Sequence, residues 1–244
     1  AESLFGNACA RWADSAFGGG LWYNDDRKVK SVYQANLILA GVRLSEVTGD
    51  PGYRERALPL YEWVERHLLR PDGLTWCDYG ENGPRISGNH REAASDTFLG
   101  GNMAMGVIAA RLYRDTGRKV YKDRALRAAK AVTTLETDGK GALMDDRDAW
   151  TDGYFMGYWA REVLTLPGIR PEARKILQRT AQAIWQRARK PDGFYSGCWN
   201  GPVEGEACPW TKAGFRPQQI MTSASAVHVL VAAISPEAGA PKSQ

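Results

Sequence analysis

The segment R-L-S-E-V-T-G at residues 43–49 occurs again, with changes, as R-L-Y-R-D-T-G at residues 111–117. Each copy is followed by a tyrosine and then by the triplet R-A-L, and the copies start 68 residues apart, at 43 and 111. A third, degenerate copy starts at Arg161, where Leu-Pro-Gly at residues 166–168 replaces Thr-Gly. Self-similarity over this distance indicates a fold assembled from repeated supersecondary units.

Each unit predicts two helices that are joined by a tight turn and closed by a glycine-bearing loop. Gly49 suits the left-handed conformation that ends the first helix, and Pro71 stops the second. The spacing of apolar residues predicts helices over 3–14, 29–48, 52–69, 97–116, 119–136, 153–165, 170–189 and 219–234. The apolar stripe predicted for the helix at 29–48 is Val29, Tyr33, Leu37, Ala40, Leu44 and Val47. Almost no segment has a strand pattern.

These eight helices predict an all-α fold, an (α/α) toroid of helical hairpins. In each unit the first helix is more apolar or richer in small residues, so it is expected inside the ring, with the second helix outside. An open α-solenoid is the alternative. The ring is favoured because tryptophan-bearing loops recur at one end, where a ring would converge them on one pocket. The length fits one large domain or two small ones, and we predict a single toroid domain over residues 1–244.

Composition excludes several classes of protein. Hydrophobic residues make up 43% and charged residues 25% of the chain, which is ordinary for a globular protein and excludes a largely disordered one. No stretch reaches 18 consecutive apolar residues, so no membrane span is predicted. The net charge of +4 is spread along the chain, so no nucleic-acid partner is predicted.

No metal or cofactor is expected. The sequence contains no P-loop, G-x-S-x-G or H-E-x-x-H motif, and its three histidines lack ligand spacing. The four cysteines form no C-x-x-C pair. Two interpretations of the cysteines stay open: a disulfide between Cys198 and Cys208, or four buried thiols.

Carboxylates are the remaining candidates for chemistry. The run D-D-R-D-A-W-T-D at residues 145–152 crowds four aspartates ahead of a predicted helix. Cleavage of a glycosidic bond needs two carboxyl groups, so Asp145 and Asp146 are the candidate catalytic pair. Asp152 is a candidate substrate-binding residue because Trp150 and Tyr154 flank it. Helix capping is the alternative role for these aspartates, and Asp78 and Asp96 are weaker candidates.

The chain is rich in large aromatic residues, with nine Trp and ten Tyr. Five of them, Trp22, Tyr23, Trp76, Trp150 and Trp199, lie in or follow the loops that close the units. They are candidate flat surfaces for stacking against sugar rings. A hydrophobic cap on the ring is the alternative. Trp63 and Trp185 lie within second helices, where a packing role is predicted.

The order of several motifs resembles glycoside hydrolase family 76. The run G-G-G-L-W-Y at residues 18–23, then Lys30, then a helix that ends in T-G-D at residues 48–50 is similar to the family's G-G-G-I-W-W, K-N and A-R-L…T-G-D. W-N-G-P at residues 199–202 and S-A-S-A at residues 223–226 fit its later segments. The resemblance implies an (α/α)6 toroid and a metal-free endo-α-1,6-mannanase, acting by a retaining double displacement. It also implies a secreted or periplasmic protein acting on wall mannan.

The chain departs from the family pattern in two places. The family's catalytic D-D-x-x-W-W lies before the triple-glycine loop, but the 17 residues before Gly18 contain no such pair. The family's T-Y-N-Q-G is replaced around residues 97–102. The resemblance therefore predicts an incomplete ring without its first hairpins, whose exposed apolar helices would favour a homodimer. It does not transfer the catalytic role to Asp145 and Asp146, but it does place Asp152 near the family's cleft-lining G-D-G-D-Q.

Two classes of function follow. The first is a glycoside hydrolase-like protein acting on an α-mannan-type polysaccharide through carboxylate acid/base chemistry. The second is a non-catalytic protein that binds glycans or serves as a scaffold. A weaker resemblance, of W-T-D-G-Y and M-G at residues 150–157 to unsaturated glucuronyl hydrolases, offers an alternative enzyme, although that family's Arg and Asn are absent here.

Overall fold

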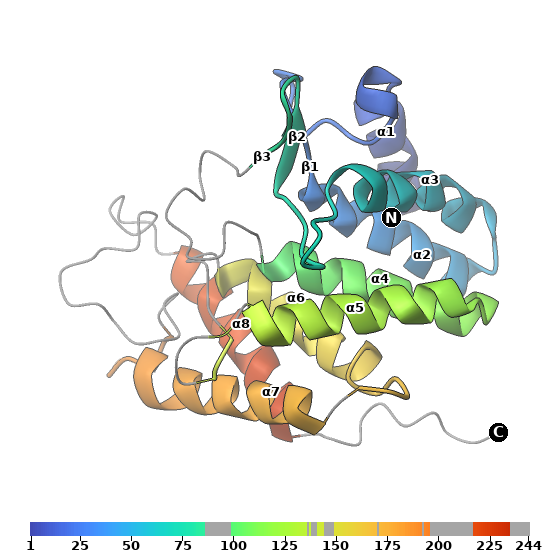
Figure 1. The fold of residues 1–244 in the computed structure, drawn as a ribbon. Helices are drawn as coiled ribbons and strands as arrows, with labels where there is room; N and C mark the ends of the chain where they lie inside the picture. The colour runs from blue at the N-terminus through green and yellow to red at the C-terminus, as the bar shows by residue number, and fades with distance from the viewer. Residues whose placement is uncertain are drawn as a thin grey trace. The chain divides into compact units, whose positions relative to one another are not determined.

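The computed structural model describes most of the chain as two compact units, residues 1–128 and 129–244. The described residues are 1–85, 99–135, 137, 141–143, 149–169, 171–191, 193–195 and 217–234, with backbone alone at 85 and over 149–154 and 217–222. They include eight α-helices (Figure 1). In the part of the chain that is described, no helix is both long enough and apolar enough to cross a membrane.

The first unit is built from the repeat that the sequence predicted. Its helices are α1 (Glu2–Trp12), α2 (Ala35–Thr48), α3 (Gly52–His67), α4 (Leu99–Thr116) and α5 (Lys119–Leu135), whose last residues run past the unit's end. Gly49 ends α2 in the left-handed conformation with φ 75°, and Gly117 follows α4 with φ 66°. The turn chemistry of both copies is therefore confirmed.

A small antiparallel sheet, missed by the sequence analysis, lies in this unit. It has the order β1 (Lys30–Ser31), β2 (Asp78–Gly80), β3 (Gly83–Arg85) (Figure 1). Strands of two or three residues are too short to show an alternating pattern. Because β1 and a 3-10 turn occupy residues 30–34, α2 begins at Ala35 instead of residue 29.

The buried face of α2 also differs from the prediction. The helix buries Ala35, Ile38, Leu39, Gly41 and Val42. Two members of the predicted stripe, Ala40 and Val47, are exposed. The run A-N-L-I-L-A-G-V is apolar on several sides, so its spacing fits more than one helical face, and packing against neighbours selects one of them.

The other helices of the unit match the predicted contrast between apolar and amphipathic members. Every residue of α4 from Leu99 to Leu112 is buried. Helix α3 buries one side, and its Trp63 is 2% exposed, which confirms the predicted packing role. Helices α2 and α3 pack against each other, and α2 also packs on α4.

The second unit contains α6 (Ala149–Glu162), α7 (Pro171–Ala183), a π-helical turn (Ile184–Ala188) and α8 (Pro217–Ile234). Helices α6 and α8 pack along each other, and α7 contacts α8. Helix α6 starts at Ala149, earlier than the predicted residue 153, so Asp152 lies within the helix instead of ahead of it. The packing role predicted for Trp185 is wrong, because Trp185 is 53% exposed. The π-helical turn changes the helical phase there, burying Ile184 and Ala188 and turning the indole outward.

Candidate functional site

The triple-glycine loop before Trp22 wraps around the buried side chain of Lys30. Lys30 has no exposed surface, and its Nζ donates to Asp14 Oδ1 at 2.8 Å and to the carbonyl oxygens of Ala16 and Gly19 at 2.7 Å each. Residues 18–20 all have positive φ, at 75°, 113° and 80°. Because glycine adopts such angles at no steric cost, the three glycines let this loop close around the ammonium.

Trp63 of α3 supports the loop from the other side. A Cβ on Gly20 would lie 2.6 Å from the Trp63 ring, so no larger residue fits there without movement of the indole. The Trp63 Nε1 donates to the carbonyl oxygen of Phe17 at 2.9 Å. The loop is therefore held by Lys30 on one side and by a helix side chain on the other.

Asp14 is the acidic partner in this arrangement. It accepts hydrogen bonds from Lys30 Nζ, from the Trp22 indole and from the Ala16 backbone N–H. The bonds from Lys30 and Trp22 are the main cause that lowers the pKa of Asp14 to about 2. Asp14 is thus an ionised, fully engaged carboxylate at neutral pH.

Trp22 and Tyr23, the two aromatic residues predicted to contact substrate in this segment, differ in their exposure to solvent. Trp22 is 9% exposed, with the Lys30 ammonium 4.7 Å from its ring centroid and the Phe17 ring edge-on at 5.6 Å. Tyr23 is 48% exposed, and its ring lies 5.4 Å from that of Tyr33. The aromatic surface that this loop presents to solvent is therefore chiefly that of Tyr23.

The small sheet connects this loop to the segment that carries Trp76. Trp22 forms an antiparallel bridge with Lys30, and Lys30 pairs with Tyr79 of β2. Trp76 is partly exposed just before β2, with the Arg70 guanidinium 4.8 Å from its ring centroid. Trp22, Tyr23 and Trp76 thus flank strands of the same sheet.

Asn102 of α4 holds the segment that carries Trp76 through hydrogen bonds to Thr75. Its buried Oδ1 accepts from the backbone N–H and the hydroxyl of Thr75, at 2.7 and 2.9 Å. The sequence indicated only a departure from a family motif around Asn102. Asp78, a weaker sequence candidate, is a buried residue of β2.

The remaining predicted site residues are not tested by the structure. Trp150, Asp152 and Tyr154 have their backbone in the first two turns of α6, and their side chains lie outside what is described. The following also lie outside the described residues: Asp145, Asp146, Trp199, Asp96, Cys198 and Cys208. Within the described ranges, no group of three or more His, Cys, Asp or Glu could hold a metal ion.

Burial differs between the two cysteines that the structure describes. Cys77 is fully buried, as the second interpretation of the cysteines expects. Cys9 is only partly buried, which differs from that interpretation, and desolvation raises the pKa of its thiol.

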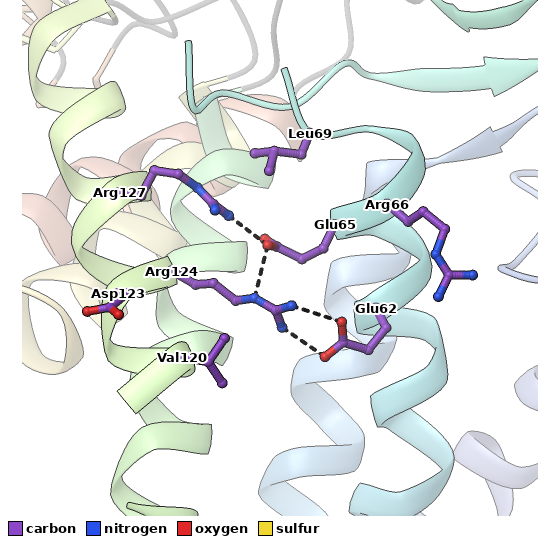
Figure 2. Close-up of a pocket in the computed structure, with 8 residues that line it drawn as sticks. All are labelled: Glu62, Glu65, Arg66, Leu69, Val120, Asp123, Arg124 and Arg127. Carbon is purple, nitrogen blue, oxygen red and sulfur yellow. Dashed lines mark hydrogen bonds and ion pairs between the residues drawn. The ribbon is translucent and has the colours of Figure 1, made fainter. Parts of the chain in front are cut away.

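A separate groove of about 640 Å³ lies between α3 and α5 (Figure 2). Arg124 donates to both carboxylate oxygens of Glu62, at 2.8 and 3.0 Å, and Arg127 donates to Glu65 at 2.6 Å. Burial acts to lower the pKa of Arg124, but the bond to Glu62 and the nearby acidic groups outweigh it and raise that pKa. The lining residues are Glu62, Glu65, Arg66, Leu69, Val120, Asp123, Arg124 and Arg127.

Ion pairs across the groove join the two helices, because each of its two glutamates is paired with arginine. We call these pairs, of Arg124 and Arg127 with Glu62 and Glu65, the clamp. The sequence did not predict this groove. The available pattern was a pair of glutamates three residues apart in α3 and a pair of arginines with the same spacing in α5.

Comparison with known proteins identifies the relatives of this architecture. The family model for glycosyl hydrolase family 76 matches residues 1–240. The GH76A α-1,6-mannanase of Salegentibacter sp. HEL1_6 superposes with a TM-score of 0.75 at 20% identity, covering 97% of this chain and 68% of that chain. An inactive variant of that enzyme, with two adjacent aspartates replaced by alanine, was solved with α-1,6-mannotetrose and gives a TM-score of 0.76 over the same shares at 20% identity.

More distant structures share the same fold. A family 76 mannosidase of Bacteroides thetaiotaomicron gives a TM-score of 0.70 at 12% identity, covering 97% of this chain and 64% of that chain. Dfg5 of Chaetomium thermophilum, solved with glucosamine, gives 0.72 at 16% identity, covering 98% and 63%. A search of curated proteins found no significant match.

These likenesses confirm the predicted fold class, because family 76 structures are (α/α)6 toroids. The chain spans roughly two thirds of the length of the mannanase that it matches. Since the family model extends over nearly the whole sequence, the chain belongs to glycosyl hydrolase family 76.

Proposed function

We propose that this chain acts as a glycosidase on an α-mannan-type polysaccharide. The family match over residues 1–240 carries the proposal, and the likeness to α-1,6-mannanases supports it. The proposed chemistry uses two carboxyl groups, one as proton donor and one as nucleophile or base. Asp14 does not suit the proton-donor role, because its pKa of about 2 leaves it ionised at neutral pH. Asp145 and Asp146 remain the proposed pair.

The proposed substrate contacts are the aromatic residues near the closing loops. The exposed ring of Tyr23 supports this role in the first unit, since a flat ring open to solvent can stack against a sugar face. Trp22 would contribute mainly by supporting Tyr23. The other proposed contacts are Trp76, Trp150, Asp152, Tyr154 and Trp199.

The experiment that tests this function is release of oligosaccharides from linear α-1,6-mannan by the purified chain. We expect product from the wild type and a loss of about a thousandfold or more in an Asp145→Asn/Asp146→Asn variant. The matched control is Asp25→Asn/Asp26→Asn, an adjacent and exposed pair in the first unit, which should keep wild-type rates. Equal product from both double variants would move the chemistry to other carboxylates.

A non-catalytic glycan-binding protein is the second candidate. The exposed Tyr23 ring beside Tyr33 favours it, because such a surface binds sugar with no carboxylate chemistry. Binding to immobilised mannan without any released product, from a wild type that folds normally, would select this function over the first.

We also infer that copies of the chain associate, through the exposed apolar side of α8. Val227, Val231 and Ile234 are 49%, 55% and 78% exposed and recur at helical spacing. Sedimentation velocity should show a dimer that Val231→Asp weakens, and a strictly monomeric wild type would contradict this inference.

Because wall mannan lies outside the cytoplasm, we propose that the protein is secreted or periplasmic. Cell fractionation tests this localisation.

A further inference from the structure

We propose that Lys30 is a positioning residue whose buried ammonium fixes the Trp22–Tyr23 segment by acting as the central cation of the Asp14–Gly20 loop. The role of that segment in glycan contact rests on the proposed function. The ordering of the segment does not, and it is measured separately below.

Five oxygen atoms converge on the ammonium of Lys30. Besides Asp14 Oδ1 and the carbonyl oxygens of Ala16 and Gly19, the Gly20 carbonyl lies 3.3 Å and the Asp14 carbonyl 3.4 Å from Lys30 Nζ. An ammonium has only three protons to donate, so five oxygens around it form a shell of the kind that surrounds a bound cation. The carbonyl dipoles and the Asp14 carboxylate all direct negative charge at Lys30 Nζ, so without the ammonium they would repel one another.

The backbone of this loop adopts angles that need restraint from its partners. Gly18, Gly19 and Gly20 have positive φ, and so does Phe17 at 54°, which is a strained angle for a residue with a side chain. Glycine gains more conformational freedom than other residues when a loop opens. A run of three therefore stays ordered only if its partners restrain it, and the Lys30 bonds to Gly19 and Gly20 supply that restraint together with the Trp63 bond to Phe17.

Lys30 is also directly connected to the aromatic segment. Lys30 and Trp22 form a backbone bridge, and the ammonium lies over the Trp22 ring. Asp14, which holds Lys30, also accepts from the Trp22 indole. The backbone N–H of Tyr23 donates to Val29 at 2.9 Å, next to Lys30 in sequence. Loss of the ammonium would therefore release Trp22 and Tyr23 together.

The test is hydrogen exchange at the backbone amides of Leu21, Trp22 and Tyr23 in the full chain. Each of these amides donates a hydrogen bond, to Gln34 Oε1, Trp12 O and Val29 O respectively. We expect Lys30→Ala to speed exchange at all three by roughly tenfold to a hundredfold, as loss of charge-assisted bonds implies. Lys28→Met, which alters an exposed lysine two residues before Lys30, is the matched control and should leave exchange unchanged.

Chemical rescue separates the charge from the packing of the lysine stem. Propylammonium fits the space that Lys30→Ala vacates, and 1-propanol has nearly the same size without the charge. We expect propylammonium to restore protection and propanol to fail. Unchanged exchange in Lys30→Ala, or equal rescue by both compounds, would overturn the proposal.

Asp14→Asn covers the case in which Lys30→Ala does not fold. It keeps the size of the side chain, removes the negative partner and leaves the carbonyl oxygens in place, so exchange at Trp22 and Tyr23 should rise by a smaller factor. Wild-type exchange in Asp14→Asn would then count against the proposal. Mannan affinity is measured in parallel. If the variants exchange faster but even the wild type binds no mannan, the proposed function is contradicted and the positioning role of Lys30 is supported.

Discussion

The hairpins α2–α3 and α4–α5 carry the same motif in different surroundings. Arg43 and Arg111 are its first residues, and both donate to Oε2 of Glu46, at 2.9 and 2.6 Å. The Arg43 side chain is 46% exposed, whereas that of Arg111 is 8% exposed. The motif is the same in each copy, but the burial of the helix that carries it decides how much each arginine contributes to stability.

The helix ends, in contrast, are alike in both copies. Thr48 and Thr116 each donate from the hydroxyl to the carbonyl oxygen four residues earlier. Gly49 and Gly117 then donate their backbone N–H to the helix. These contacts are local, so they depend on neighbours in sequence and repeat wherever the sequence repeats. Tertiary contacts do not repeat in this way, and four comparisons measure the difference.

The largest expected effect comes from the two arginines. Arg111→Gln should lower the free energy of unfolding by about 2–3 kcal/mol, because the nearly buried guanidinium loses its charge-assisted bond to Glu46, whose side chain is 30% exposed. Arg43→Gln should change it by less than about 0.5 kcal/mol, as is usual for exposed pairs. Urea unfolding of both variants measures the two values. Similar losses in both would show that burial does not separate the two copies.

The next effect concerns Gly41 of α2. Ala109 occupies the corresponding position in the second copy of the repeat, 68 residues later. A Cβ on Gly41 would lie 2.8 Å from the Phe5 ring and 2.9 Å from the Ala57 Cβ. Gly41→Ala should therefore destabilise the chain by about 1–2 kcal/mol in thermal or urea unfolding, even though alanine favours helices. The reciprocal change, Ala109→Gly, should also destabilise, by about 1 kcal/mol. A Gly41→Ala variant more stable than the wild type would mean that Phe5 of α1 and Ala57 of α3 move aside at little cost.

The same distinction explains what the sequence predicted. Helix ends followed from Thr-Gly pairs, because a left-handed glycine is a local requirement, and the repeat then placed the helices. The buried face of α2 did not follow, because A-N-L-I-L-A-G-V offers more than one apolar side and neighbours choose among them. The sheet was missed because β1 pairs with β2 across more than forty residues, at Lys30 and Tyr79, with strands too short to leave a pattern.

The candidate site divides in the same manner. The glycine run before Trp22 marked a special loop and an aromatic pair at its end. The sequence did not reveal that Trp22 lies under Lys30 or that its indole bonds to Asp14, because both contacts depend on how the loop folds back. Tyr23 remained exposed, and so it is the member of the pair best suited to the predicted contact.

A smaller effect is expected at the two left-handed glycines. Nothing lies within 4 Å of a Cβ built on Gly49 or on Gly117, so only the backbone angle opposes a side chain there. Gly49→Ala and Gly117→Ala should each cost about 1 kcal/mol. The two losses should agree within about 0.3 kcal/mol and add in the double variant. Unequal losses in thermal unfolding would show that the helix ends are less local than their shared geometry indicates.

The smallest effect concerns the clamp that joins the second helices of the two hairpins. A double-mutant cycle with Arg124→Gln and Glu62→Gln should give a coupling of about 0.5–1 kcal/mol, because the pair is bidentate but Glu62 is 41% exposed. The cycle on Lys119 and Asp123 within α5, whose side chains are 82% and 54% exposed, should give about 0.3 kcal/mol. Both couplings should shrink in 1 M NaCl, where exposed charges are screened over about 3 Å. A coupling at Arg124 no larger than that at Lys119 would make the clamp an ordinary surface pair, and the contacts of α4 with α2 would then carry the attachment between the hairpins.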